Sequence, residues 1–279
     1  MRFTKMHGAG NDYVLVDLYE EQVEDPGALA RAMTDRRVGV GADGLLLLGP
    51  PDAAEEADIS MEMLNPDGSR AEMCGNGLRC LAKFAYDNRR VAQNPFRVAT
   101  GRGVLEVSLS LSGTEVTGAC VNMGPPILDP EAIPALLPGH PVVEQDLEVG
   151  DETYKVTCVS MGNPHCVIYV DDVDAFDVES IGAAIETHEL FPRHTNVEFV
   201  QIVGRSEVKQ RTWERGAGET LACGTGACAV GVAGVLTGRT DPELVCHVRG
   251  GDLQVKWDGK GPVFLSGPAV QVFEGVWDD

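Results

Sequence analysis

The chain contains one short motif twice: Met73-Cys74-Gly75-Asn76-Gly77 and Ala222-Cys223-Gly224-Thr225-Gly226. In each copy a cysteine precedes a glycine-rich turn, which runs into an apolar stretch with helical spacing. A Gly-Asn pair followed by a β-rich run stands at a similar distance before each cysteine, at Gly10-Asn11 and at Gly162-Asn163. A repeat of this size is far longer than the roughly 20–50 residues of a solenoid repeat, and it predicts two related lobes.

Length and composition fit two globular lobes. The 279 residues suffice for two domains of ordinary size, and a hydrophobic content of 43% supports packed cores. No apolar run reaches the roughly 18 residues of a membrane span. The first residues lack the apolar core of a signal peptide, so we expect a cytoplasmic protein.

The chain is strongly acidic, with a net charge of −21. A phosphate backbone or an anionic membrane surface would be repelled by such a field. The charge therefore excludes nucleic acid and membranes as expected partners, and any anion bound here must be held by local donors.

The eight cysteines predict neither disulfides nor a metal centre. Cys120, Cys158, Cys166 and Cys246 lie in apolar runs, where a free cysteine behaves as a small hydrophobic residue. Disulfides are also disfavoured in the cytosol. The remaining spacings lack the tight Cys-x2-Cys pairs of zinc sites, so no metal is expected.

Short strands dominate the expected secondary structure. Helices are predicted at 26–33 and 178–185 and after each motif cysteine, and the residues between 130 and 141 form a proline-rich connector. We expect an N-terminal lobe over 1–121, completed by the tail at about 268–279, and a C-terminal lobe over 122–267. The expected strands are 3–6, 13–17, 45–48, 59–64, 96–100, 103–110, 115–121, 153–160, 166–170, 197–203, 208–212, 244–248 and 252–255.

A thiol at the start of a helix suits acid–base chemistry. The helix dipole and the N–H groups of the first turn favour the thiolate, so we expect a lowered thiol pKa. The same N–H groups can hold a carboxylate. Two such frames predict one base and one acid on opposite faces of a carbon next to a carboxylate, which inverts that carbon. No pattern in the sequence marks a pyridoxal phosphate site.

Longer stretches around the two cysteines closely resemble the signature of diaminopimelate epimerases. They are residues 65–80, Asn-Pro-Asp-Gly-Ser-Arg-Ala-Glu-Met-Cys-Gly-Asn-Gly-Leu-Arg-Cys, and residues 213–226, Trp-Glu-Arg-Gly-Ala-Gly-Glu-Thr-Leu-Ala-Cys-Gly-Thr-Gly. Residues 6–12, 162–165 and 195–198 match as well, so the resemblance spans nearly the whole chain.

The resemblance implies an α+β fold of two pseudo-symmetric lobes, each a mainly antiparallel β wrap around a central helix, with the site in the cleft between the lobes. It implies a two-base epimerase that uses no cofactor and interconverts L,L- and meso-diaminopimelate in lysine and peptidoglycan precursor synthesis. Diaminopimelate would be the small-molecule partner, and a homodimer is left open.

The resemblance also implies the roles of individual residues. Cys74 and Cys223 would be the acid–base pair, and His165 and Glu214 would tune their protonation. Backbone N–H groups of the two cysteine frames would hold the α-carboxylate, and six side chains would bind the substrate, of which Asn163, Asn196, Glu214 and Arg215 would bind largely its distal amino acid end. The N–H groups are those of Gly75, Asn76, Gly224 and Thr225, and the six side chains are Asn11, Asn65, Asn163, Asn196, Glu214 and Arg215. Some family members carry Gln where this chain has Gly44. A side-chain contact from this position would therefore be absent here.

Four other functions would also be compatible with parts of this pattern. A proline or hydroxyproline racemase shares the two-thiol plan, but such enzymes tend to carry His at the position of Asn76 and lack the pair Glu214-Arg215. A phenazine-type isomerase shares the fold and lacks both cysteines. From a different class, a cysteine hydrolase would use one thiol as nucleophile with His165 as its base, and a binding protein without catalysis would need neither thiol.

Overall fold

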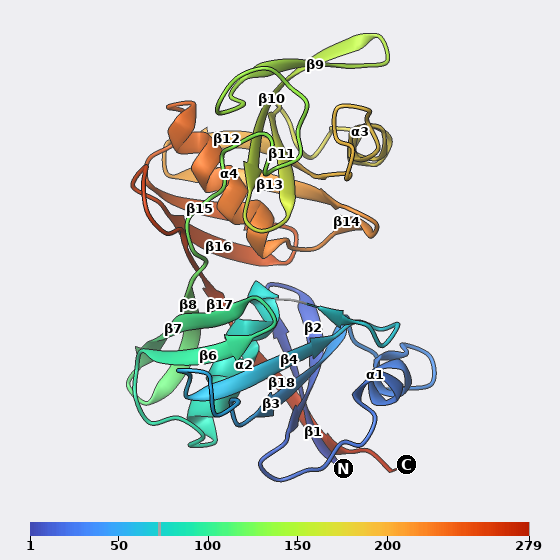
Figure 1. Ribbon diagram of the computed structural model, residues 1–279, viewed down its shortest axis with the longest axis vertical. Coiled ribbons are helices and arrows are strands. Elements are labelled where there is room, and N and C mark those ends of the chain that lie inside the picture. The colour runs from blue at the N-terminus through green and yellow to red at the C-terminus, as the bar shows by residue number, and fades with distance from the viewer. Residues whose placement is uncertain (72–73, 279) are drawn as a thin grey trace. The chain divides into compact units, whose positions relative to one another are not determined.

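The computed structural model describes residues 1–71 and 74–278. Glu72 and Met73, the last two residues of the first signature before Cys74, lie outside the described residues. The chain packs into two compact units, one formed by Met1–Asn122 with Ser266–Asp279 and the other by Met123–Leu265. Each unit is built mainly from strands around one buried helix (Figure 1).

The first unit is a set of strands that surrounds helix α2. Most strand pairs are antiparallel, and β2–β3 and β4–β6 are parallel. Its helices are α1 (Pro26–Thr34) and α2 (Gly75–Asp87). Its strands are β1 (Arg2–Gly8), β2 (Asn11–Asp17), β3 (Gly44–Gly49), β4 (Ile59–Leu64), β5 (Arg70–Ala71), β6 (Phe96–Thr100), β7 (Gly103–Ser112), β8 (Glu115–Asn122) and β18 (Val270–Val276).

The second unit repeats this plan around helix α4. Its parallel pairs are β11–β12 and β13–β15, and the strands on either side of them pair in antiparallel fashion. Its helices are α3 (Val178–Glu186) and α4 (Gly224–Leu236). Its strands are β9 (Gln145–Val149), β10 (Glu152–Ser160), β11 (Pro164–Tyr169), β12 (Asn196–Gly204), β13 (Glu207–Glu214), β14 (Gly218–Thr220), β15 (Glu243–Val248) and β16 (Gly251–Lys256); β17 (Phe264–Pro268) leads back to the first unit.

The two central helices are buried for different reasons. Helix α2 packs against β1, β2, β3, β7 and β8, yet keeps a polar edge at Lys83 and Asp87 (Figure 1). Helix α4 is made of Gly, Ala, Val, Cys, Thr and Leu and is apolar all round, which is typical of a helix enclosed by the rest of its domain. Both helices begin directly after a motif cysteine, so the glycine-rich frames fix where each thiol sits.

The α+β fold expected from the resemblance is confirmed, with strands dominating and one central helix in each unit. Five strands were not expected: β5, β9, β14, β17 and β18. Strand β9 follows the proline-rich connector, and β5 and β14 have three residues or fewer. Among the described residues, no helix has the length and apolar character needed to cross a membrane.

Candidate active site

Cys74 is the residue that caps helix α2. Its backbone is extended, at φ −139° and ψ 111°, and its Sγ accepts a hydrogen bond from the N–H of Gly77 at 3.5 Å. The hydroxyl of Tyr13, from β2, lies 3.0 Å from the same sulfur. Because Gly77 has no Cβ, Leu46 can approach the first turn: a Cβ there would lie 3.0 Å from its Cδ2. The thiol is thus held between a helix start and a buried phenol.

Two predicted site residues of the first unit lie together next to Cys74. The Nδ2 of Asn76 donates to the Oδ1 of Asn11 at 2.8 Å, and the fully buried Arg79 donates to the Oδ1 of Asn76 at 2.8 Å. This network fixes both amides beside the helix start. Asn65 lies in the turn after β4, where its Nδ2 donates to the Oγ of Ser69 at 3.0 Å.

Cys223 caps helix α4 in the same way. Its backbone has φ −116° and ψ 110°, and its Sγ accepts from the N–H of Gly226 at 3.3 Å. The hydroxyl of Thr225 lies 3.5 Å from this sulfur and accepts from the Nδ2 of Asn163 at 3.2 Å. At 5% exposure Cys223 is more buried than the partly exposed Cys74.

His165 links Asn163 to a buried carboxylate. Its Nδ1 lies 2.8 Å from the Oε1 of Glu198, and its Nε2 lies 3.1 Å from the Oδ1 of Asn163. Both His165 and Glu198 have no exposed surface. A carboxylate oxygen accepts hydrogen bonds, so Glu198 orients the imidazole ring through Nδ1.

The remaining predicted residues of the second unit lie around the same strands. The backbone N–H of Arg215 donates to the Oδ1 of Asn196 at 3.0 Å, and Asn196 donates to the carbonyl of Pro164 at 2.7 Å. The carboxylate of Glu214 accepts from the hydroxyl of Thr220 and faces Cys223. The Nη1 of Arg215 donates to the carbonyl of Arg193 at 3.1 Å.

Burial changes the acidity of both thiols in the direction opposite to our expectation. It raises the pKa of Cys74, although Tyr13 and the N–H of Gly77 partly offset the rise. The pKa of Cys223 is raised further, by burial and then by Glu214 and Glu198. The prediction of a lowered thiol pKa was therefore wrong, because desolvation of a thiolate outweighs the favourable field of one helix start.

Cys223 and two side chains near it are of types that bind metals. One atom each from His165, Glu198 and Cys223 lies within 4.8 Å of the others. Nitrogen, oxygen and sulfur are ligands that Zn²⁺ accepts. Both nitrogens of His165 already face oxygen partners, so a metal ion would have to break one of these contacts.

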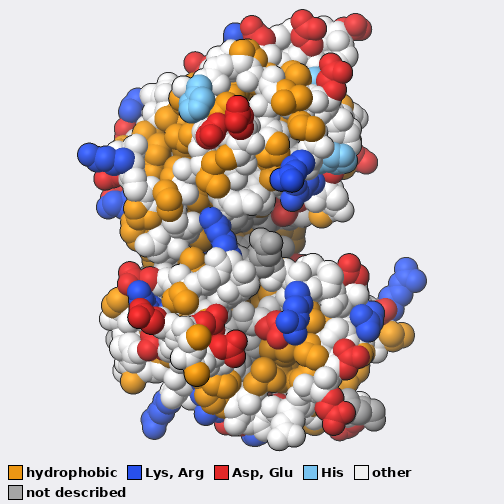
Figure 2. All heavy atoms as spheres, viewed as in Figure 1, with side chains coloured by type: hydrophobic (Ala, Val, Ile, Leu, Met, Phe, Trp, Pro, Cys, Tyr) orange, Lys and Arg blue, Asp and Glu red, His pale blue; other side chains and the backbone are white. Residues whose placement is uncertain are grey.

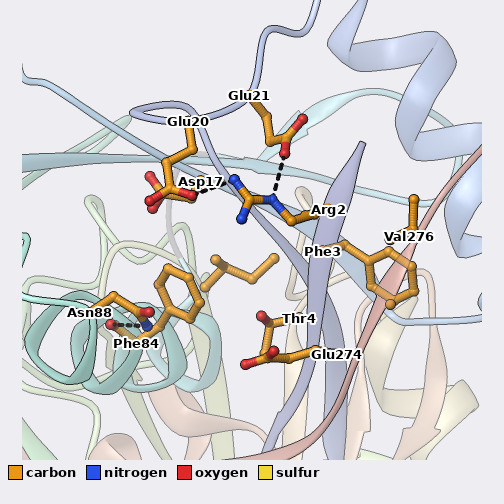
Figure 3. A pocket seen from close by; sticks show the side chains of 12 residues that line it. Arg2, Phe3, Thr4, Asp17, Glu20, Glu21, Phe84, Asn88, Glu274 and Val276 are labelled. Atoms are coloured by element: carbon orange, nitrogen blue, oxygen red, sulfur yellow. Dashed lines mark hydrogen bonds and ion pairs between the residues drawn. The ribbon is translucent and has the colours of Figure 1, made fainter.

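A separate pocket in the first unit involves no thiol (Figure 3). Arg2 lies among the carboxylates of Glu20 and Glu21 on one side of it, and Asp17 pairs with Arg90. The carboxylates of Asp17, Glu20 and Glu21 have cationic partners, and that of Glu274 accepts from the amide of Gln271 at 3.0 Å. Because it involves no thiol, this pocket is no candidate for thiol chemistry.

Two residues of the site were not predicted, Tyr13 and Glu198. Tyr13 could have been found, because it stands at the third position of Asn11-Asp12-Tyr13, where the second repeat has Asn163-Pro164-His165. The signal for Glu198 was a charged residue within the apolar run of β12.

Solved structures share this fold at low sequence identity. A probable proline racemase from Agrobacterium radiobacter superposes with a TM-score of 0.73 at 13% identity, covering 99% of this chain and 92% of that chain. A phenazine biosynthesis protein from Bacillus anthracis superposes with a TM-score of 0.70 at 16% identity, covering 99% and 98%. These two proteins and this chain therefore share one fold.

Sequence comparison identifies the family. The family described as diaminopimelate epimerase matches residues 3–128 and 157–272. Proteins named diaminopimelate epimerase from Desulfitobacterium hafniense and Moorella thermoacetica are each 50% identical to this chain, covering 99% of it and 98% of their own length. The chain belongs to the diaminopimelate epimerase family, and it is an isomerase.

Proposed function

We propose that this protein interconverts L,L- and meso-diaminopimelate with Cys74 and Cys223 as its two bases and without a cofactor. The observation that carries the proposal is the matched pair of cysteine caps, each with its sulfur against the first turn of the central helix of its unit. Membership of the family supports the choice of substrate.

The proposed reaction moves one proton off and one proton on. The thiolate of one cysteine removes the hydrogen from the α-carbon of one amino acid end, and the electron pair stays on that carbon and its carboxylate. The thiol of the other cysteine then delivers its proton to the opposite face, which inverts the centre. After turnover the two sulfurs have exchanged protonation states, so the reverse reaction uses the same groups.

The carbanion in this reaction needs preorganised donors. The first-turn N–H groups of α2 and α4, at Gly75, Asn76, Gly224 and Thr225, would hold the α-carboxylate as negative charge spreads onto it. A raised thiol pKa suits the cysteine that acts as the acid, because its thiol then stays protonated and can give its proton to the carbanion. It also makes the thiolate a stronger base once formed.

The other amide and charged residues would recognise the substrate. We propose that Asn11 and Asn65 contact the substrate from the first unit. The distal amino acid end of the substrate would be bound largely by Asn163, Asn196, Glu214 and Arg215. The guanidinium of Arg215 can hold the distal carboxylate through two hydrogen bonds, and the carboxylate of Glu214 can accept from the distal ammonium. His165 and Glu214 would tune the protonation of the thiols.

The decisive experiment is α-hydrogen exchange in D2O. We expect purified, reduced protein to convert L,L-diaminopimelate to the meso form without pyridoxal phosphate, with deuterium at the inverted centre by NMR. Cys74→Ser and Cys223→Ser should each slow epimerisation by orders of magnitude while circular dichroism shows a folded protein. Exchange on proline instead would assign the protein to the racemases, and near-wild-type activity in either serine variant would exclude the two-base reaction.

We further propose that the protein is a cytoplasmic homodimer. A reaction that needs two reduced thiols suits a reducing compartment. Strand β18 pairs with β1 and exposes the large apolar side chains of Val270, Val272, Phe273 and Val276, which a second copy would cover. Analytical ultracentrifugation tests the dimer: Phe273→Glu should yield monomers, and a wild-type monomer at micromolar concentration would exclude it.

A further inference from the structure

The two thiols sit in equivalent places with unequal surroundings. In the parallel pair β2–β3, Tyr13 stands opposite Gly44; in the parallel pair β11–β12, His165 stands opposite Asn196. Tyr13 contacts the sulfur of Cys74, and His165 lies within 4.8 Å of the sulfur of Cys223. These register positions align the two units residue by residue.

Two positions further along these strands, the units differ by a charge. The first unit has Leu46 and the second has Glu198, and both side chains have no exposed surface. A Cβ on Gly77 would lie 3.0 Å from Leu46, and one on Gly226 would lie 2.7 Å from the Oε1 of Glu198. Leu46 and Glu198 therefore occupy the same place under the first helical turn, one as hydrocarbon and the other as a carboxylate.

The buried carboxylate is unfavourable for folding by itself. One oxygen of Glu198 meets the Nδ1 of His165, and the other, Oε2, has no hydrogen-bond partner among the described residues. A buried polar atom without a partner reduces stability, and an apolar side chain of similar size is accommodated at the same place in the first unit. The charge at this position therefore points to a role in the reaction rather than in packing.

We propose that Glu198 is a positioning residue for the reaction: its carboxylate orients His165 and keeps the proton on the thiol of Cys223 at rest, so that the two thiols are unequal. This inference rests on the proposed two-base function. Three titratable side chains face Cys223, and they are His165 from β11, Glu198 from β12 and Glu214 from β13. Cys74 faces the neutral Tyr13 and lies near the cation of Arg79.

Unequal thiols suit a reaction that needs one thiolate and one thiol at once. Two independent thiols of equal pKa would place at most about half of the molecules in states with a single proton, and these would be divided between the two cysteines. A negative charge beside one thiol separates the two titrations, so that one arrangement of the proton predominates over a range of pH.

The test follows the alkylation of both thiols against pH, without substrate. Iodoacetamide reacts with the thiolate, and peptide mass spectrometry separates Cys74 from Cys223 in one sample. In the wild-type protein the midpoint for Cys223 should lie at higher pH than that for Cys74. In Glu198→Gln it should move down by roughly one to two pH units, as expected for removing a charge within 5 Å, while Cys74 stays in place. The alkaline limb of kcat/KM should move in the same direction.

Control variants separate this from general effects. Glu148→Gln removes the same charge from an exposed site on β9 and should change neither midpoint. An unchanged or upward midpoint for Cys223 in Glu198→Gln would overturn the proposal, and so would an equal shift of both thiols. If that variant does not fold, a wild-type midpoint for Cys223 at or below that for Cys74 overturns it instead. Because alkylation needs no turnover, absent epimerase activity would count against the proposed function and not against this role of Glu198.

Discussion

At the scale of single residues, the thiols show which part of the chemistry a sequence reveals. The two cysteine frames could be found because glycine and small residues repeat around them. The acidity of Cys223 could not, because it depends on desolvation and on Glu198 and Glu214, whose carboxylates come close to the sulfur only when the chain is folded. Glu198 lay within a stretch that resembles the family, yet nothing local to it indicated a neighbouring sulfur.

The hydroxyl of Tyr13 should lower the pKa of Cys74, because it lies 3.0 Å from the sulfur and can donate to a thiolate. We expect Tyr13→Phe to move the acid limb of the pH–rate profile to higher pH and to reduce kcat about tenfold near neutral pH, because a smaller fraction of Cys74 is then in the thiolate form that removes the proton. The alkylation midpoint of Cys74 should rise with it. Tyr154→Phe removes a phenol that bonds Glu152 at the surface, so it should leave both profiles in place.

At the scale of elements, long periodic segments could be predicted and short ones could not. Helix α2 and strands such as β4 and β6 have their own apolar pattern, so the sequence indicates them. Strands β5 and β14 exist because β4 and β13 offer them hydrogen-bond partners, and their own residues give no such signal. Both stand shortly before a motif cysteine, where local pairing sets the approach to the helix.

Helix α4 tests how closely the core of the second unit is packed. A Cβ on Gly231 would lie 2.5 Å from the Cγ1 of the buried Val255 on β16, and a β-branched side chain in a strand cannot easily turn away. Alanine in a helix gains about 1 kcal/mol over glycine, whereas overpacking costs about 1–3 kcal/mol. We therefore expect Gly231→Ala to lower the free energy of unfolding, measured by urea denaturation.

The double variant decides whether Val255 is the cause. Val255→Ala alone leaves a cavity and destabilises the protein, but it also makes room for a methyl group at residue 231. In Gly231→Ala with Val255→Ala, the loss should be smaller than the sum of the two single losses by at least about 0.5 kcal/mol. Strict additivity would mean that the two residues do not compete for space.

Strands β1 and β2 are tied together by a nearly buried ion pair, Lys5 with Asp12 at 2.6 Å. Burial alone would raise the pKa of Asp12, but hydrogen bonds from Arg36 and Lys5 outweigh it and lower the pKa to about 2. A carboxyl whose pKa is lower in the folded state adds stability above its unfolded value near 4, and this is lost as pH falls towards about 2. Asp12→Asn should therefore unfold more easily than wild type at pH 6, and the gap in urea denaturation should narrow at pH 3. A gap independent of pH would mean that shape rather than charge holds the strands.

At the scale of the whole molecule, the repeat in the sequence corresponds to two units with the same plan and different electrostatics. The sequence indicates the repeat because glycine, asparagine and cysteine recur in the same order. The differences between the units arise where equivalent positions hold Tyr13 and His165, or Leu46 and Glu198. The repeat in the sequence already aligns the first of these pairs, whereas the second becomes visible only when the strand register aligns it.

The net charge of the chain predicts how salt affects its stability. Acidic residues outnumber basic ones by 43 to 22, and Figure 2 shows acidic side chains scattered over the visible face of each unit. Salt weakens exposed ion pairs, but each of these contributes only about 0–1 kcal/mol to stability. Salt also screens the repulsion among the excess acidic groups, and we expect this stabilising effect to be the larger one. We expect the Tm at pH 7.5 to rise between about 0.05 and 0.5 M NaCl, where the Debye length falls well below 10 Å. The same salt change near pH 4.6, the isoelectric point, should have little effect, because the net charge is then close to zero. A Tm that falls with salt at pH 7.5 would show that local ion pairs, and not the net charge, govern the electrostatic stability of this protein.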